Sequence, residues 1–278
     1  MAMKLARYNG EKLGLVDGGT IIDITGEFEL SSSDPLREFL SEGYDLSDIE
    51  GSGTKQPLSE IRLEAPVHRP GKIVAAPLNY EKHVAEMGVD MDIAERGYFL
   101  KAPSSLIGPN DTIELPYSDE RFDYEVELAF IMGSDVKDIP AEEVWDNVLG
   151  YTILLDISLR GDQDRSNRKS FDTFTVVGPF VVTPDEVGDP QALDMELQLN
   201  GETRQAVNTD DMIYSCADIV QYASIGATIK AGDVVTTGTP SGVGELQAGD
   251  RIYAQIENIG SMEVSVTERD LRFADLDV

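Results

Sequence analysis

The chain has 278 residues, in which 22 Lys and Arg stand against 52 Asp and Glu, so that the formal net charge is −30. This length suits one large domain or a large domain with a smaller partner, and a 41% share of hydrophobic residues argues against global disorder. The acidic surplus excludes nucleic acid and anionic membranes as partners, because both need a basic footprint on the protein.

Nothing in the sequence indicates a secreted or membrane-spanning protein. No stretch reaches the ~18 consecutive apolar residues of a membrane span, and the first residues, Met1–Ala6, lack the apolar core of a signal peptide. The one cysteine, Cys216, cannot form an internal disulfide, which is typical of a reducing compartment. We therefore expect a cytoplasmic protein.

The acidic residues are spread along the whole chain, which leaves two interpretations open. In an acidic mesophilic enzyme, high charge aids solubility. In a halophilic protein, a carboxylate-rich surface stays soluble while molar salt screens its self-repulsion. The size of the charge favours the halophilic interpretation, and neither interpretation says what the protein does.

In chain order, about 65 residues first predict a small β-rich module. Strand-like runs at Lys4–Tyr8, Leu13–Val16 and Thr20–Asp23 are separated by Gly-rich turns, and an acidic helix is expected near Pro35–Glu42. A loop over residues 51–54 and a proline-bracketed segment over residues 66–70 follow. We expect an N-terminal domain over residues 1–68 and a catalytic domain over residues 69–278.

From Lys72 onward the pattern predicts many short strands and few helices. Asn200-Gly201 between two strands indicates a hairpin, because this pair accepts the positive φ angles of a type I′ turn. The fold class is therefore mostly β, of the α+β kind. The expected helices are Tyr80–Met87, Ala141–Val144 and Cys216–Ala223, and the expected strands are Lys72–Ala76, Thr112–Leu115, Tyr124–Met132, Gly150–Leu155, Phe180–Val182, Met195–Leu199, Asp233–Thr237, Arg251–Ile256 and Met262–Val266.

Three carboxylates are candidate metal ligands. Residues two apart in a strand face the same side, so that Glu125 and Glu127 share one face. Asp156 ends the apolar strand that comes next. An oxygen-only cluster without Cys or His suits a hard cation, with Mg²⁺ first and Mn²⁺ or Ca²⁺ next. In an acidic protein most such pairs are only solvated surface residues, so the pattern needs support from its surroundings.

A histidine with a carboxylate partner lies upstream. His83 and Glu86 are three residues apart and share one face of a short predicted helix. A carboxylate in this position orients an imidazole and raises its basicity, as a general base requires. The simpler interpretation is that His83 and Glu86 are a surface pair without a catalytic role. We expect no catalytic role for the other histidine, His68, either.

These segments, taken in order, resemble the fumarylacetoacetate hydrolase family, in its acylpyruvase and 2-hydroxyhepta-2,4-diene-1,7-dioate isomerase branch. The resemblance covers roughly Lys72 to Val266. It rests on Asn79-Tyr80 with His83 and Glu86, Phe99–Leu106, the Glu125/Glu127 strand, Gly150-Tyr151 leading to Asp156, Arg160 with Gln163, Lys169–Phe174 before Gly178-Pro179, Gly232-Asp233-Val234, and Gly238–Gly244.

The resemblance implies a fold and a set of roles. The fold is a rolled mixed β-sheet core behind a small N-terminal domain, usually in a homodimer. Glu125, Glu127 and Asp156 are expected to bind Mg²⁺ or Mn²⁺. His83, Glu86 and Lys169 are the expected catalytic residues, and Tyr80, Arg160, Gln163 and Thr239 are expected to bind substrate. Only twelve residues separate Asp156 from Lys169, fewer than in some members, so the pocket wall there is expected to differ.

These residues suit the hydrolysis of a C–C bond in a 2,4-diketo acid. Its adjacent oxygens can chelate a divalent ion, which stabilises the departing fragment as a metal-bound enolate, while water activated by His83 attacks the remote carbonyl. Lys169 and Arg160 can hold the substrate carboxylate or the developing oxyanion.

The same set of residues could also support other reactions. They are isomerisation or decarboxylation of 2-hydroxymuconate-type diacids of aromatic catabolism (5-carboxymethyl-2-hydroxymuconate or 2-hydroxyhepta-2,4-diene-1,7-dioate), and dehydration of 2-keto-3-deoxy sugar acids. A catalytically silent acidic binding protein on this fold is the non-enzymatic alternative. Glycines at both ends of residues 88–97 further predict a mobile lid over the substrate.

Overall fold

The computed structural model describes residues 2–88 and 97–276. Its N-terminal part is an antiparallel meander of short strands with one helix beside it. The helix begins after Asp34, whose side chain accepts a hydrogen bond from the backbone N–H of Arg37, and Pro35 takes its first position. These elements are β1 (Lys4–Tyr8), β2 (Lys12–Asp17), β3 (Thr20–Asp23), α1 (Pro35–Ser41) and β4 (Lys55–Pro57).

The middle of the chain supplies the longest central strands and the helix α2. They are β5 (Ile73–Ala75), α2 (Glu81–Met87), β6 (Phe99–Lys101), β7 (Leu106–Ile107), β8 (Thr112–Leu115), β9 (Phe122–Tyr124), β10 (Val126–Met132), α4 (Ala141–Val144), β11 (Val148–Asp156), β12 (Ser158–Leu159), α5 (Arg165–Arg168) and β13 (Thr175–Val182). The C-terminal part adds α6 (Pro184–Val187), β14 (Asp194–Leu199), β15 (Glu202–Asn208), α7 (Cys216–Gly226), β16 (Val234–Thr236), β17 (Gly244–Glu245), β18 (Arg251–Ile256) and β19 (Gly260–Glu268).

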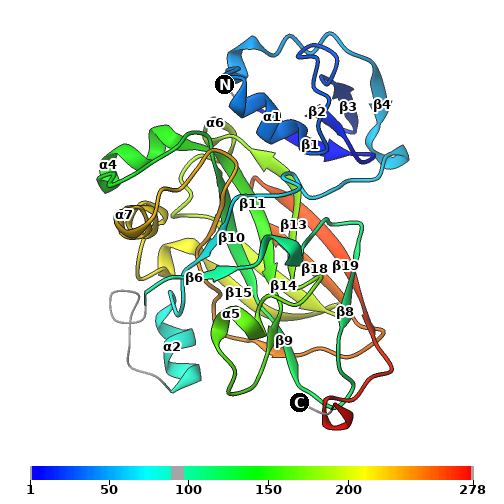
Figure 1. Cartoon of the computed structure of the whole chain (residues 1–278), viewed down its shortest axis with the longest axis vertical. Coiled ribbons are helices and arrows are strands. Elements are labelled where there is room, and N and C mark those ends of the chain that lie inside the picture. Colours follow the sequence, from blue (N-terminus) through cyan, green and yellow to red (C-terminus); the bar gives the residue numbers. More distant parts are fainter. Residues whose placement is uncertain (1, 89–96, 277–278) are drawn as a thin grey trace.

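The described strands form three sheets. The largest runs in the order β4-β3-β2-β1-β13-β11-β10-β16-β5-β6, with β7 beside β13. A second runs β15-β14-β18-β19-β8, and a small third runs β12-β9-β17. Most neighbours are antiparallel, whereas β7 with β13, β5 with β16 and β8 with β19 are parallel. Figure 1 shows the long central strands at the middle of the molecule, with α7 and α4 at one side.

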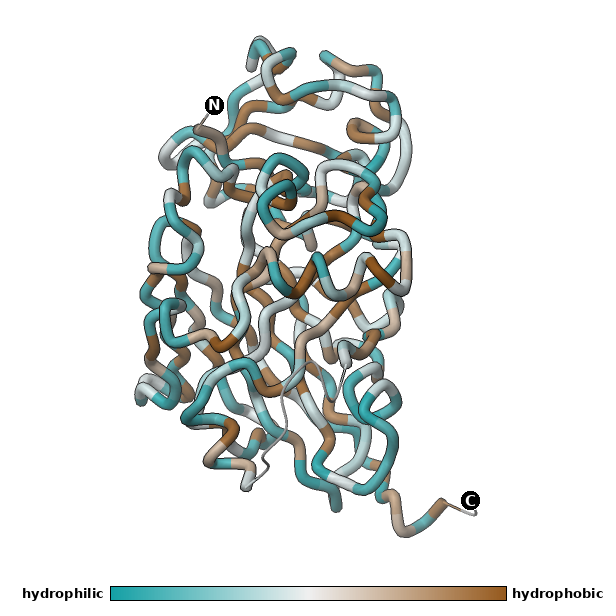
Figure 2. The backbone as a smooth tube through the Cα atoms, turned by 90° about the vertical axis from the view of Figure 1, so that its left-hand side faces the viewer, coloured by the Kyte–Doolittle hydropathy of each residue, from teal (hydrophilic) through white to brown (hydrophobic). Residues whose placement is uncertain are grey.

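The core lies on both faces of β10. Leu128 and Phe130 face the large cluster shared with the five-stranded sheet and α7, whereas Ala129 and Ile131 face a second cluster. Both β10 and β11 are buried along their whole length, because each face of the sheet is covered. Figure 2 shows hydrophobic stretches running through the interior strands and hydrophilic stretches in the outer loops.

The N-terminal module continues the central sheet. β1 pairs with β13 in the register Lys4 to Val182 and Leu5 to Val181. The second hydrophobic cluster also joins the two parts, since Leu36 of α1 and Ile131 of β10 both belong to it. The division into domains 1–68 and 69–278 stays a prediction. The largest sheet and the second hydrophobic cluster both contain residues from each side of this boundary.

The expected α+β class with mixed sheets is confirmed. The helix expected from Tyr80 begins one residue later, because Tyr80 keeps an extended backbone as the residue before the helix. The hairpin between β14 and β15 is present, with φ of 54° at Asn200 and 82° at Gly201. In the described ranges, no helix is long and apolar enough to cross a membrane. Most of the predicted lid falls on residues 89–96, which lie outside the described residues.

Candidate active site

Three carboxylates converge where β10 and β11 meet. Glu125 precedes β10, Glu127 is the second residue of β10, and Asp156 ends β11. The backbone N–H of Asp156 donates to the carbonyl of Glu125 (2.9 Å), and this bond holds the two strand ends together. One oxygen from each carboxylate lies within 4.8 Å of the others, and the three residues are at most 4% exposed. The alternation of side chains along the strand thus places Glu125 and Glu127 together.

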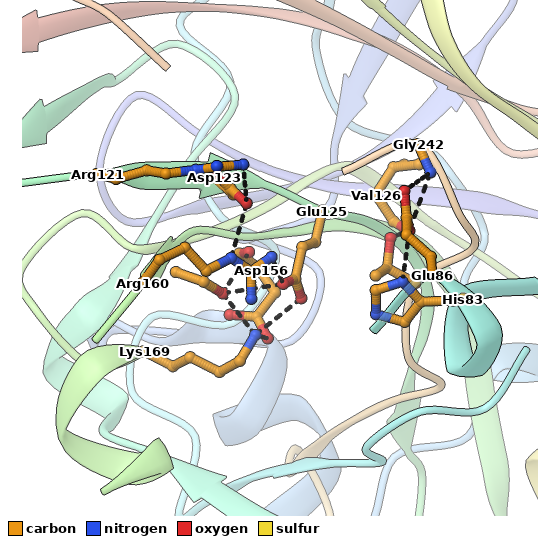
Figure 3. Close-up of polar contacts among 12 residues, drawn as sticks. His83, Glu86, Arg121, Asp123, Glu125, Val126, Asp156, Arg160, Lys169 and Gly242 are labelled. Carbon is orange, nitrogen blue, oxygen red and sulfur yellow. Dashed lines mark hydrogen bonds and ion pairs between the residues drawn. The ribbon is translucent and has the colours of Figure 1, made fainter. Parts of the chain in front are cut away.

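Lys169 holds the cluster from one side (Figure 3). Its ammonium contacts Glu125 Oε2 at 2.8 Å, Asp156 Oδ2 at 2.7 Å and the hydroxyl of Ser158 at 2.5 Å. An ammonium has three N–H donors, and these contacts use all of them. Lys169 therefore fixes the orientation of the carboxylates.

Lys101 is a second buried lysine at the cluster, and no sequence pattern had indicated it as a site residue. Its ammonium contacts Asp156 Oδ1 and donates to the carbonyl of Phe174 (2.8 Å). Burial lowers the pKa of Lys101, even though the Asp156 charge acts against that change. The period-2 alternation of β6, which turns Phe99 and Lys101 inward and Leu100 outward, is the signal that could have revealed it.

Arg160 connects the cluster to a second carboxylate pair. Its Nε donates to Asp123 Oδ2 at 2.7 Å, and its Nη2 donates to Glu125 Oε1 at 2.8 Å. Asp123 also accepts two hydrogen bonds from Arg121, at 2.8 and 3.1 Å. Figure 3 shows this chain of contacts leading from Arg121 to Glu125. The guanidinium of Arg160 thus compensates the charge of Glu125.

The two glutamates have opposite electrostatic environments. Burial alone would raise the pKa of Glu125, but the charges of Lys169 and Arg160 outweigh burial and lower this pKa to about 2. For Glu127, burial and then the charges of Asp156 and Glu125 act together and raise the pKa to about 8. A cation between the carboxylates would favour the ionised form of Glu127. This all-oxygen donor set fits a divalent metal ion of the hard class.

The predicted dyad is assembled on α2. His83 is 5% exposed, and its Nδ1 lies 3.0 Å from Glu86 Oε2. Glu86 also accepts from the backbone N–H of Gly242, at 3.1 and 3.3 Å. With Nδ1 engaged by the carboxylate, Nε2 is the nitrogen available as a base.

The loop after β16 connects the dyad with the carboxylates. The N–H of Gly238 donates to Glu127 Oε2 at 3.0 Å, and the hydroxyl of Thr236 donates to the same oxygen. Thr239 is held by hydrogen bonds to the carbonyl of Val126 (2.9 Å) and from the amide of Gln205 (2.8 Å). The same loop therefore contacts a metal-ligand candidate through Gly238 and, through Gly242, the base dyad.

A cavity of about 170 Å³ is lined by most of the residues predicted for the site. A water molecule in the liquid occupies about 30 Å³, so the space suits a metal ion with a small organic acid. Seven of the ten residues predicted for the site line it: His83, Glu125, Glu127, Asp156, Arg160, Lys169 and Thr239.

The other three predicted residues lie outside the cavity lining. Glu86 lies behind His83, in contact with its ring nitrogen. Tyr80 is 1% exposed and packs in the large hydrophobic cluster, because the backbone turns into α2 immediately after it. Gln163 is exposed on the short connection before α5. Substrate-binding roles for Tyr80 and Gln163 stay predictions.

Comparisons with known proteins show which family the chain belongs to. Residues 72–267 match the family model described as fumarylacetoacetate (FAA) hydrolase C-terminal. The chain is 40% identical to a maleylpyruvate hydrolase of Aquipseudomonas alcaligenes, over 95% of this chain and 99% of that protein. A crystal structure of a maleylpyruvate hydrolase from Sphingobium sp. SYK-6 superposes with a TM-score of 0.87 at 37% identity, covering 96% of this chain and 100% of that one.

A second structure of the Sphingobium enzyme, with a TM-score of 0.85 over 96% of this chain and 99% of that one, is in complex with a manganese(II) ion and pyruvate. The similarity extends to isomerases. A 2-hydroxyhepta-2,4-diene-1,7-dioate isomerase from Mycobacterium marinum is 30% identical, with a TM-score of 0.79 over 96% of this chain and 99% of that one. This chain is an enzyme that belongs to the fumarylacetoacetate hydrolase family.

Proposed function

We propose that the enzyme hydrolyses a C–C bond of a 2,4-dioxo acid of the acylpyruvate type, with a divalent metal ion. The observation that carries this proposal is that a histidine base and an all-carboxylate cluster line the same cavity. Similarity to two maleylpyruvate hydrolases supports it, one of them seen with manganese(II) and pyruvate. Pyruvate is the fragment that hydrolysis of an acylpyruvate releases.

Glu125, Glu127 and Asp156 would hold the metal, and Mg²⁺ or Mn²⁺ fits their oxygen atoms. When bound, such an ion supplies Lewis-acid stabilisation for the negative charge that develops on the 2-oxo acid. Lys169 and Arg160 position the carboxylates through their ion pairs. Because Lys169 uses all three donors in this way, we assign it a positioning role in place of direct substrate binding.

His83 acts on water. Glu86 holds Nδ1, so Nε2 takes a proton from a water molecule as that water attacks the acyl carbonyl carbon. The bond between this carbon and C3 then breaks, and its electron pair stays on the three-carbon fragment as the enolate of pyruvate. The proton held by His83 can return to C3, which completes pyruvate and leaves the acyl part as a carboxylic acid.

Isomerisation of a 2-hydroxymuconate-type diacid is the second candidate, favoured by the similarity to the Mycobacterium marinum isomerase. It requires a proton shuttle at the same cavity and no attacking water. The predicted homodimer, the cytoplasmic location and the decarboxylase and dehydratase alternatives stay predictions.

A substrate panel tests the proposal. Purified enzyme with Mg²⁺ or Mn²⁺ is assayed on acetylpyruvate, on oxaloacetate and on 2-hydroxyhepta-2,4-diene-1,7-dioate, and the products are resolved by mass. We expect cleavage of acetylpyruvate to pyruvate and acetate, with loss of activity on chelation. Conversion of the dienedioate without any cleavage of acetylpyruvate would favour the isomerase.

A further inference from the structure

A glutamine occupies a core-facing position on β15, the outermost strand of the five-stranded sheet. Gln205 is 0% exposed, and Leu197, the residue opposite it on β14, is also fully buried. A register shift in this ladder leaves Arg204 as an extra residue between two successive residue pairs. Bulges of this kind redirect a side chain and are frequent next to active sites. Gln205 is therefore turned inward, to a place where an apolar side chain would be usual.

The side-chain amide of Gln205 has a partner for each of its groups. Its Oε1 accepts a hydrogen bond from the backbone N–H of Val126 at 3.0 Å. Its Nε2 donates to the hydroxyl of Thr239 at 2.8 Å and to the carbonyl of Pro240 at 2.9 Å, which uses both N–H donors. A buried amide without partners is unfavourable, so these three hydrogen bonds explain how a glutamine is stable at this position.

The contacts close a ring around Val126, the residue between Glu125 and Glu127. The hydroxyl of Thr239 donates to the carbonyl of Val126 at 2.9 Å. Gln205 thus holds the N–H of Val126 directly and its carbonyl through Thr239. These two groups belong to the two peptide units that connect Glu125 with Glu127, so the ring fixes the backbone that sets the spacing of the two carboxylates.

The loop after β16 extends this influence to the base dyad. The two loop residues that contact Gln205 lie between Gly238 and Gly242. The N–H of Gly238 donates to Glu127, and the N–H of Gly242 donates to Glu86 (Figure 3). Gln205 itself is not part of the cavity lining. It therefore acts on the site through other residues.

We propose that Gln205 is a positioning residue for the reaction. From the second sheet, it holds Glu125 and Glu127 at a fixed spacing for the metal ion and keeps the loop after β16 in place beside the dyad. It does so through Val126 and Thr239. This inference rests on the proposed function, because it takes the carboxylate cluster as the metal site.

Metal binding, measured apart from catalysis, tests this role. Calorimetric titration of the chelator-treated protein with Mn²⁺ alone gives a Kd, and thermal melting without metal gives the loss of stability. Gln205→Met keeps the length of the side chain and removes all three hydrogen bonds. Groups that orient metal ligands typically change metal affinity 10- to 100-fold. Because Gln205 acts through the backbone, we expect Mn²⁺ binding to weaken at least about fivefold, and kcat on acetylpyruvate to fall at least about tenfold.

Thr209→Val is the matched control for the loss of buried hydrogen bonds. Thr209 lies just after β15 and is 0% exposed, and its hydroxyl accepts from the N–H of Leu193 and donates to the carbonyl of Pro190, both at 2.8 Å. It is not part of the cavity lining. This variant should melt at lower temperature, as Gln205→Met should, and keep its Kd for Mn²⁺ within about twofold of the wild type.

Thr239→Val breaks the same ring at its other side chain, with a smaller change in the core, and tests the inference even if Gln205→Met does not fold. We expect it to weaken Mn²⁺ binding at least about threefold. Since the ring acts as one unit, the double variant Gln205→Met/Thr239→Val should bind Mn²⁺ within about twofold of the weaker single variant.

A Gln205→Met protein that melts at lower temperature but binds Mn²⁺ as the wild type does would overturn the positioning role and leave the proposed function standing. Unchanged Mn²⁺ binding in Thr239→Val, an equal weakening in Thr209→Val, or losses that multiply in the double variant would overturn it as well. Failure of the wild type to bind Mn²⁺ would contradict the proposed function and this inference together.

Discussion

At the scale of single residues, Glu127 has the least favourable environment at the site. Its pKa is raised to about 8 by burial and by the charges of Asp156 and Glu125. Glu125, only two residues away, has a pKa of about 2 because two basic side chains contact it. Cationic side chains thus compensate one of the two glutamates, and a metal ion would compensate the other.

The first prediction follows from this imbalance. A saturating divalent ion that binds only the folded state should raise the melting temperature, by roughly 5 °C at a hundredfold excess over its Kd. Glu127→Gln should abolish both this rise and the activity. Glu263→Gln, which removes the same charge from an exposed position on β19, should keep both. Scanning fluorimetry with EDTA or Mn²⁺ measures the shift, and full turnover by Glu127→Gln would refute the metal assignment.

The second prediction concerns the base. General-base assistance is typically worth about 10²- to 10⁴-fold, so His83→Ala should lower kcat on acetylpyruvate at least about a hundredfold with KM little changed. His68→Ala is the control, because His68 is the only other histidine and lies outside the cavity lining. A loss below about fivefold in His83→Ala would show that His83 does not activate water, and the isomerase would then be the better candidate.

At the scale of elements, the side-chain alternation within a strand was easier to predict than the contacts between distant strands. The alternation along the strand was sufficient to place Glu125 and Glu127 on one face. Asp156 joins them through the pairing of β11 with β10, and its place in the cluster was expected with the support of the family resemblance. The inward position of Lys101 was missed, because β6 is only three residues long and its alternation is a weak signal.

Long-range contacts were beyond the sequence patterns. The pairing of β1 with β13 joins Lys4 to Val182, and no local pattern specifies which distant edge a short strand will join. The burial of Tyr80 depends on how the β5–α2 loop turns into the core, which is a tertiary property. The exposed position of Gln163 likewise depends on the short connection between Asp156 and Lys169.

The third prediction concerns the loop after β16. Gly238 has φ of 86°, and a Cβ there would lie 3.1 Å from the carbonyl oxygen of Ala76. Gly238→Ala should therefore destabilise the fold by at least about 1 kcal/mol and displace the N–H that holds Glu127. Gly249→Ala is the control, because Gly249 has a similar φ of 93° with no atom within 4 Å of the added Cβ.

Both glycine variants should unfold at lower temperature, and only Gly238→Ala should weaken Mn²⁺ binding and kcat/KM by more than about tenfold. Titration of Mn²⁺ followed by calorimetry, together with steady-state kinetics, distinguishes them. Equal kinetic losses in the two variants would show that the loop does not position the carboxylate cluster.

At the scale of the whole molecule, the charge of −30 is the dominant property. We propose that it reflects adaptation to high salt. The Debye length grows from ~3 Å in 1 M salt to ~10 Å in 0.1 M salt, so repulsion among surface carboxylates should increase on dilution. Lowering KCl from molar to ~0.1 M should therefore lower the melting temperature by several degrees. A melting temperature that is constant over this range would favour the acidic mesophilic interpretation.

The most direct test of C–C bond hydrolysis is the fate of water oxygen. Acetylpyruvate is converted by the Mn²⁺-loaded enzyme in H₂¹⁸O, and mass spectrometry follows acetate and pyruvate over short times, with enzyme-free and chelated samples as controls. We expect equal amounts of acetate and pyruvate, with one oxygen of each acetate derived from the solvent water, and no conversion after chelation. Conversion that leaves the carbon skeleton intact, or that releases carbon dioxide, would contradict C–C bond hydrolysis.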